Sequence, residues 1–218
     1  MDFHFSIDDV FESLFDKEHP VVEVVNELEY PVDLYCFYQG NKKTLCDITE
    51  NHFNSNVQFN VHGLDKETPP YLQTPKEQKS VFNDIYYEFQ RIGYEKSNQT
   101  RLHYFSESYE LSDYFLERGV DTLYTTDKEA LLWRLPTKLK ESISEKGQCN
   151  YQRLNFVRTT LRIENLIGLE SYEIADTLFQ IAYSKKPITI MTHEYELKRP
   201  EVQAMTKFVI KFLKDMEI

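Results

Sequence analysis

The sequence predicts an α/β fold: a single (β/α) barrel of about seven strands that takes up residues 1–218. Strand-like segments alternate with amphipathic helical segments along the chain, which is typical of parallel βαβ units. Polar and ionisable residues fall at or near the C-terminal ends of several strands, where β/α barrels carry their catalytic groups. An open doubly wound sheet is the alternative. Residues from several strands meet at one place only if the sheet curls round on itself, which favours the barrel.

The first strand carries the most informative stretch. Apolar and polar residues alternate over residues 3–8, and the run ends in two adjacent carboxylates, Asp8 and Asp9. Successive strand residues point to opposite faces, so both acids can converge only where the strand gives way to a loop. The alternative role for Asp9 is a helix N-cap, with Glu12 completing a capping box.

The remaining strands are predicted from alternation and β-branched or aromatic content. They are expected at residues 32–38, 57–62, 101–105, 120–126, 156–163 and 187–192, with a further short strand at 131–135. Helices are predicted from apolar residues at helical spacing and from glycines that end them, such as Gly93 and Gly119. They are expected at residues 20–29, 45–53, 75–92, 108–118, 170–183 and 201–216, with a charged, helix-bearing excursion at 136–152.

Composition excludes several classes of partner. The formal net charge is −11 and the basic residues are scattered, so nucleic acid and anionic membranes are not expected to bind. No apolar run approaches the roughly 20 residues that cross a bilayer. Cys36, Cys46 and Cys149 form neither an even set nor a metal-type cluster. They are interpreted as free thiols in a reducing cytoplasm, and the first residues lack the order of a secretory signal.

The ionisable residues at the strand ends point to acid–base chemistry. The chain has no Gly-rich phosphate loop, Gly-x-Ser-x-Gly elbow, Cys-x-x-Cys pair or His-Glu-x-x-His helix. What remains is a set built from Asp8, Asp9, His62 and His193. A carboxylate to activate water, a histidine to protonate a leaving group and a metal to polarise a carbonyl make a hydrolase site. A lone buried histidine is, however, more often structural than functional.

Four segments, in order, resemble the motifs of the polysaccharide deacetylases, metal-dependent carbohydrate esterases on a distorted β/α barrel. Phe5-Ser-Ile-Asp-Asp9 looks like the opening motif, and Asn60-Val-His62 lies where the family has a His-x-x-x-His metal motif. Arg101-Leu-His-Tyr104 resembles the Arg-x-Pro-Tyr segment, and Ile190-Met-Thr-His193-Glu194 is similar to the late Leu-x-His-Asp motif. The resemblance implies a distorted or incompletely closed (β/α)7-type barrel.

The resemblance also implies roles for individual residues. Asp8 would be the catalytic base, Arg101 its positioning residue and His193 the acid, while Asp9 and His62 would bind the metal. The other polar or aromatic residues at strand ends and in the third motif are expected to contact substrate: Tyr38, Tyr104, Arg162, Glu164 and Glu194.

The sequence departs from the family at several positions. Lys66 stands at the second metal histidine, His103 at the proline and Val10 at a glycine. The family's Asp-x-x-Asp-Trp segment has only a loose counterpart in Asp127 and Trp133. The departures bear more on the activity than on the fold.

The identity of the third metal ligand is therefore open. Asp65 and His103 are the candidates, and His103 is preferred because a strand residue is held more rigidly than a loop carboxylate. With it, a divalent zinc, cobalt or nickel ion would have the three protein ligands usual at a catalytic site. The alternative is a site without metal, in which His62 and His103 hydrogen-bond to Asp8 and Asp9 and Lys66 supplies the positive charge.

Two functions follow from these residues. The first is hydrolysis of a non-peptide C–N amide bond, which would deacetylate an N-acetylated sugar or a related small, soluble substrate. The second is a non-catalytic carbohydrate-binding or regulatory barrel that keeps the pocket without the chemistry, since fold does not fix function.

Overall fold

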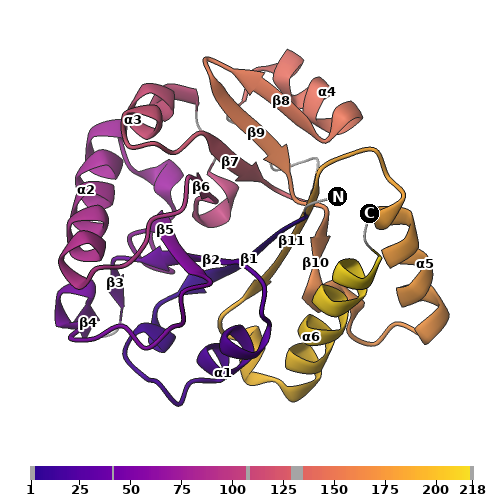
Figure 1. The fold of residues 1–218 in the computed structure, drawn as a ribbon. Coiled ribbons are helices and arrows are strands. Elements are labelled where there is room, and N and C mark those ends of the chain that lie inside the picture. The colour runs from indigo at the N-terminus through magenta and orange to yellow at the C-terminus, as the bar shows by residue number, and fades with distance from the viewer. Residues whose placement is uncertain (1–2, 41, 107–108, 129–134, 217–218) are drawn as a thin grey trace.

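The computed structural model describes residues 3–40, 42–106, 109–128 and 135–216. Strands form its centre and helices surround them (Figure 1). The larger sheet is parallel and has the order β10 (Leu161–Arg162), β11 (Ile188–His193), β1 (Phe3–Val10), β2 (Val32–Phe37) and β5 (Val57–Gly63). The smaller sheet has the order β6 (Gln99–Thr100), β7 (Thr122–Thr125), β9 (Leu154–Arg158) and β8 (Gln148–Tyr151), with β8 antiparallel to β9.

Backbone hydrogen bonds join the two sheets on both sides. On one side, Phe59 of β5 donates its N–H to the carbonyl of Glu95 and accepts from the N–H of Ser97. On the other, Thr159 donates to Thr125 of β7 and the neighbouring Thr160 donates to Thr189 of β11. The two sheets thus curl round one axis, although the described strands do not form one continuous ladder of backbone hydrogen bonds. The predicted fold class, a distorted or incompletely closed barrel, is confirmed.

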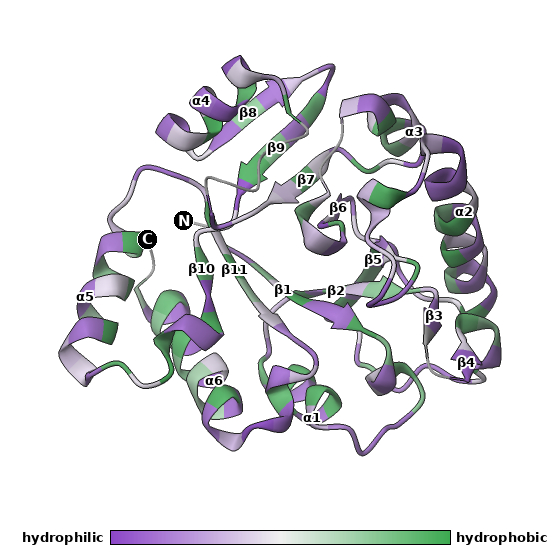
Figure 2. Cartoon of the chain, turned by 180° about the vertical axis from the view of Figure 1, so that it is seen from behind, coloured by the Kyte–Doolittle hydropathy of each residue, from purple (hydrophilic) through white to green (hydrophobic). Residues whose placement is uncertain are grey.

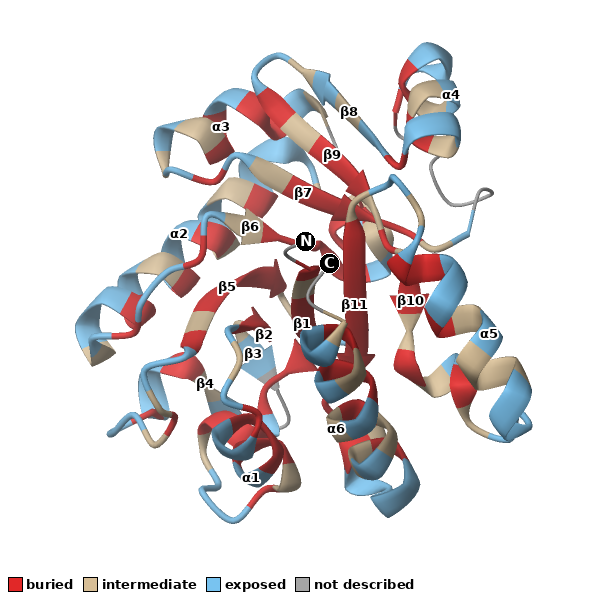
Figure 3. Ribbon diagram, turned by 45° about the vertical axis from the view of Figure 1, so that its right-hand side comes forward, coloured by how far each residue is buried: buried red, intermediate tan, exposed pale blue. Residues whose placement is uncertain are grey.

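Six helices of the described residues pack on the outside of the strands: α1 (Pro20–Glu27), α2 (Pro75–Ile92), α3 (Ser112–Glu117), α4 (Thr137–Lys146), α5 (Ser171–Ala182) and α6 (Pro200–Asp215). Figure 2 shows that their hydrophobic residues alternate with hydrophilic ones around each helix. In Figure 3, β1 and β11 are buried along almost their whole length, while the helices bury one side. Of the helices that the structure describes, none has both the length and the apolarity to cross a membrane.

Short elements complete the described chain. The hairpin of β3 (Gln39–Gly40) and β4 (Lys43–Thr44) follows β2. The 3-10 helices are η1 (Glu12–Leu14), η2 (Leu45–Asp47), η3 (Pro70–Leu72), η4 (His103–Phe105), η5 (Tyr109–Leu111), η7 (Ile163–Leu166) and η8 (Glu196–Lys198). Several of them follow barrel strands directly, so they form one end of the barrel.

The structure corrects four sequence-based predictions. Residues 101–105 are not a strand, because Tyr104 and Phe105 have φ of 53° and 51° and left-handed residues cannot continue one. Residues 156–163 are two strands in different sheets, since Thr159 and Thr160 carry the chain from β9 to β10. The helix at 45–53 is only η2, and the predicted excursion at 136–152 also contains strand β8. The strand at 131–135 falls almost wholly on residues 129–134, outside the described ranges.

Candidate active site

Strand β1 delivers two adjacent carboxylates to one end of the barrel. Its register against β2 shifts between Ile7 and Val10, and Asp9 has a left-handed backbone with φ of 58°. This bulge breaks the alternation of strand side chains. Asp8 and Asp9 therefore both line one cavity of about 220 Å³. The other residues that line this cavity are His62, Arg101, Leu102, His103, Tyr104, Phe105, Arg162, His193 and Tyr195. We call it the catalytic cavity after the roles expected of Asp8 and His193.

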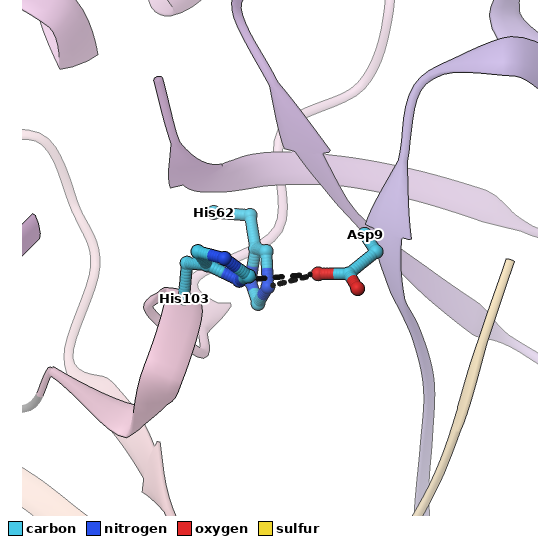
Figure 4. A group of neighbouring side chains, drawn as sticks. All are labelled: Asp9, His62 and His103. Atoms are coloured by element: carbon cyan, nitrogen blue, oxygen red, sulfur yellow. Dashed lines mark hydrogen bonds and ion pairs between the residues drawn. The ribbon is translucent and has the colours of Figure 1, made fainter. Parts of the chain in front are cut away.

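Three of these side chains form a candidate metal site (Figure 4). Oδ1 of Asp9 lies 3.0 Å from Nε2 of His62 and 3.2 Å from Nδ1 of His103. His62 comes from the end of β5 and His103 from η4, and the three ligand atoms lie within 4.8 Å of one another. The ring of Phe37 packs against both imidazoles, with centroids 5.1 and 4.8 Å away. The group is buried and its backbone positions are fixed by strand and turn.

The hydrogen bonds on the far sides of the two imidazoles fit a metal. Nδ1 of His62 lies 2.5 Å from the carbonyl oxygen of Arg101, and Nε2 of His103 lies 3.2 Å from that of Lys66. A carbonyl oxygen only accepts, so each of these nitrogens is assigned the proton. In the neutral rings, the form that binds a cation, the other nitrogens then present lone pairs toward the Asp9 carboxylate, whereas in doubly protonated rings the same nitrogens donate to it. A divalent cation satisfies this arrangement, and such outer hydrogen bonds are usual for metal-binding histidines.

Electrostatics keep Asp9 ionised. Burial alone would raise the pKa of this carboxyl group, but hydrogen bonds from His103 and His62 and nearby positive charge outweigh it. The pKa of Asp9 is held well below its ordinary range. One carboxylate and two imidazoles are a ligand set suited to zinc, cobalt or nickel.

Lys66 and Asp65, the other residues considered at the metal site, take different places. Besides its carbonyl contact to His103, Lys66 holds its Nζ 5.5 Å from the centre of the Tyr195 ring. Oδ1 of Asp65 accepts from the backbone N–H groups of Glu67 and Thr68. His103 is thus the third member of the cluster that the structure describes.

Asp8 is held beside the cluster by a buried arginine. Nη1 of Arg101 donates to Oδ1 of Asp8 at 2.9 Å and to Oγ of Ser6 at 2.7 Å. Arg101 is fully buried, and its guanidinium lies over the rings of Tyr35 and Tyr124. The orientation of the Asp8 carboxylate is therefore fixed by Arg101 and Ser6.

His193 has its own carboxylate partner. Its Nδ1 lies 2.6 Å from Oε1 of Glu164, and the same oxygen accepts from the His193 backbone N–H at 3.0 Å. Burial alone would lower the pKa of His193, but the hydrogen bond to Glu164 and the charges of Glu164, Asp8 and Asp9 raise it above its ordinary value. This pairing fixes the ring through Nδ1 and favours a protonated imidazole.

The five residues expected to contact substrate lie in different places. Tyr104 and Arg162 line the catalytic cavity, and Glu164 is the partner of His193. The residues that line this cavity do not include Tyr38, whose hydroxyl is 3.8 Å from Sγ of Cys46, or Glu194. The Glu194 carboxylate is buried and accepts from three consecutive backbone N–H groups, those of residues 11–13.

Sequence reasoning missed four residues around the site. Ser6 shares the Arg101 donor with Asp8, and Leu102, Phe105 and Tyr195 line the catalytic cavity. Leu102 lies within the third motif, Phe105 follows it directly, and Tyr195 follows the last motif. Proximity to the motifs was the available signal, but only the turn geometry places these side chains.

No protein-family model and no curated protein sequence matches the chain. Solved structures do match. The Bc1960 peptidoglycan N-acetylglucosamine deacetylase aligns at a TM-score of 0.60 and 12% identity, over 98% of this chain and 82% of that one. A family 4 carbohydrate esterase from Streptomyces lividans aligns at a TM-score of 0.57 and 8% identity, over 98% and 88%. The fold is that of the polysaccharide deacetylases, as the resemblance implied.

The same fold also occurs in an enzyme of another reaction class. The 4-alpha-glucanotransferase from Thermococcus litoralis aligns at a TM-score of 0.58 and 14% identity, over 98% of this chain but 37% of that one. The fold therefore leaves the reaction open, and the side chains of the catalytic cavity must decide it.

Proposed function

We propose that the protein is a metal-dependent hydrolase that removes the acetyl group from the amide of an N-acetylated sugar. The observation that carries this proposal is the meeting of three units in one cavity. They are the Asp9–His62–His103 cluster, Asp8 fixed by Arg101, and His193 fixed by Glu164. Together they supply a metal site, a base and an acid, which amide hydrolysis requires.

Asp8 is the proposed general base. Arg101 and Ser6 both engage its Oδ1, so Oδ2 has no hydrogen bond to any described residue. That oxygen is available to take the proton of an attacking water molecule. Arg101 keeps the carboxylate correctly oriented while the water attacks the amide carbonyl carbon.

His193 is the proposed general acid. Glu164 occupies its Nδ1, so the proton on Nε2 is the one that moves to the amide nitrogen as the C–N bond breaks. The products are acetate and a free amine on the sugar. A divalent ion held by Asp9, His62 and His103 would polarise the amide carbonyl as a Lewis acid.

The small volume of the catalytic cavity supports a substrate of which only the acetamido group enters. A volume of about 220 Å³ is below the usual size of a drug-like pocket, which suits a small buried group on a larger ligand. Tyr104 is 53% exposed and offers its ring to a sugar face at the rim. Carbohydrate is therefore the proposed partner. A cytoplasmic location fits the three free cysteines, of which Cys46 is exposed.

The test is acetate release from N-acetylglucosamine and its short oligomers by protein loaded with zinc, cobalt or nickel. Activity is expected in the wild type and a loss of at least about 100-fold in Asp8→Asn. Asp113→Asn is the matched control, because Asp113 is exposed on α3 and makes no hydrogen bond to a described residue.

The same panel of sugars distinguishes the hydrolase from the alternative function. Sugar binding by calorimetry without turnover in any metal-loaded sample would replace the hydrolase with a non-catalytic carbohydrate-binding barrel. Equal activities of wild type and Asp8→Asn would refute Asp8 as the base.

A further inference from the structure

A second, larger cavity lies at the opposite end of the barrel from the catalytic cavity. It has a volume of about 670 Å³ and is lined by the N-terminal parts of β1, β2, β5 and β11 and by residues of β7 and β9. The catalytic cavity, by contrast, is built at the C-terminal ends of β1, β5 and β11. The two cavities share no lining residue. We call the second one the lower cavity.

The lining of the lower cavity favours a ligand without charge. No Lys or Arg is among the described residues that line it, and Asp33 is its one carboxylate. Oδ2 of Asp33 already accepts from Ser97 Oγ at 2.6 Å and Tyr35 OH at 3.2 Å, and lies 3.0 Å from Nε2 of His4. An ionic ligand would find no free counter-charge, so phosphates, carboxylates and amines are disfavoured.

Several polar groups in the lower cavity are available to a ligand. The side-chain amides of Gln58 and Asn155 are half-buried and have no hydrogen bond to any described residue. Nδ1 of His4 is buried and has no hydrogen-bond partner in the described part of the chain. Amides both donate and accept, which matches hydroxyl groups that do the same.

The lower cavity also has aromatic surface and a suitable size. Phe3 and Tyr30 line it and stack with ring centroids 4.2 Å apart and planes 3° apart. Tyr124 lines it as well and stacks on His4 at 4.1 Å. A volume of about 670 Å³ falls within the range of small-molecule sites. Aromatic faces, neutral amides and no free charge together suit a pyranose ring.

We propose that the lower cavity binds a neutral monosaccharide, at a site separate from the catalytic cavity. The assignment does not depend on the proposed hydrolase function, because it needs neither the metal cluster nor Asp8. The wall of this site reaches the catalytic machinery: the Tyr124 ring that lines it also lies 5.3 Å from the Arg101 guanidinium. Tyr124 is therefore unsuitable for a test of binding, and Gln58 and Asn155 are better choices.

The experiment is a calorimetric titration of the full chain with glucose, galactose and mannose, with adenosine and inorganic phosphate as comparison ligands. Saturable binding of at least one sugar is expected. The double variant Gln58→Leu/Asn155→Leu should weaken it by at least about tenfold, the effect of about 1.4 kcal/mol. The matched control is Gln90→Leu, at an exposed amide of α2 that lines neither cavity, which should bind the sugar as the wild type does. Tyr104→Ala, at the rim of the catalytic cavity, reports sugar binding at that cavity instead.

A second pair of variants distinguishes a loss of sugar binding from a loss of folding. Gln58→Glu and Asn155→Asp keep the side-chain shape but replace the NH2 donor with a charged oxygen, and each should also weaken binding while the unfolding midpoint stays close to wild type. No binding of any of the three sugars would overturn the proposal. So would binding that is lost in Tyr104→Ala and kept in the double variant, or binding of adenosine or phosphate alone.

Discussion

The carbonyl oxygen of Arg101 lies 2.5 Å from Nδ1 of His62, while the guanidinium of the same residue donates to Asp8 at 2.9 Å. One residue therefore sets the tautomer of a proposed metal ligand and the orientation of the proposed base. Arg101 follows directly on β6, so the smaller sheet carries the contact that organises both groups on the larger sheet.

Removal of the Arg101 guanidinium should cost both stability and activity. Arg101→Met leaves the Asp8 carboxylate buried without its cation, and loss of one partner of a buried pair costs about 3–5 kcal/mol in unfolding free energy. Denaturant unfolding measures this. Arg199→Met, at an arginine whose side chain is 46% exposed, is the control and should cost at most about 1 kcal/mol.

Arg101→Lys separates charge from geometry. It keeps a positive charge but loses the planar fork, so we expect most of the stability to return while acetate release falls on the order of 100-fold. A lysine variant with wild-type turnover would mean that Arg101 acts through its charge alone.

The candidate metal site of Asp9, His62 and His103 predicts which histidines hold an ion. Wild-type protein dialysed against zinc should retain it stoichiometrically, and His62→Ala and His103→Ala should each lower the affinity by at least about 10–100-fold. Elemental analysis of the dialysed samples measures this. His52→Ala is the matched control, since His52 contacts the carbonyl of Ser13 instead of the cluster. A wild type that retains neither zinc, cobalt nor nickel would refute the metal site.

The Glu164–His193 pair predicts the alkaline side of the pH profile. The general acid must be protonated, and its pKa is raised, so acetate release should persist above pH 6.5, the ordinary pKa of histidine, and fall only as pH passes the raised value. Glu164→Gln removes the carboxylate charge and should move this fall to lower pH. A profile that does not move would remove Glu164 from this role.

The same shift has a consequence for stability. Because the folded-state pKa of His193 is raised, the protonated ring stabilises the fold fully below the unfolded pKa, and this contribution is lost as pH rises through the folded value. Denaturant midpoints should therefore decline over that window in the wild type and decline less in Glu164→Gln. An identical slope in both proteins would contradict the assignment.

Glu194 predicts a structural effect at the start of the chain. Its carboxylate accepts from the backbone N–H groups of Phe11, Glu12 and Ser13 at 2.8–3.0 Å. Glu194→Ala leaves buried donors unpaired and should cost about 1–3 kcal/mol in unfolding free energy. Glu117→Ala, at an exposed residue of α3, is the control and should stay within about 0.5 kcal/mol of wild type. Equal midpoints for the two variants would refute this role for Glu194.

The sequence predicted the longer strands of the larger sheet best. β1, β2, β5 and β11 lie in the larger sheet, and their alternation or apolar content was visible in the residues. The segment at 101–105 misled because its apolar and aromatic residues look like a strand. The direction of the chain in this segment depends on the left-handed backbone of Tyr104 and Phe105, a conformation that tyrosine and phenylalanine seldom adopt.

What the sequence determined by itself was which ionisable residues stand at the strand ends: Asp8, Asp9, His62 and His193. Which distant residues hydrogen-bond to one another is determined only by the tertiary structure. Glu164, expected to contact substrate, hydrogen-bonds to His193 across 29 positions of sequence, and Glu194 hydrogen-bonds to the turn that follows β1. Hydrophobic periodicity encodes which face of a strand is buried, but a hydrogen bond between two loops depends on how both strands end. That information exists only once the barrel has brought those ends together.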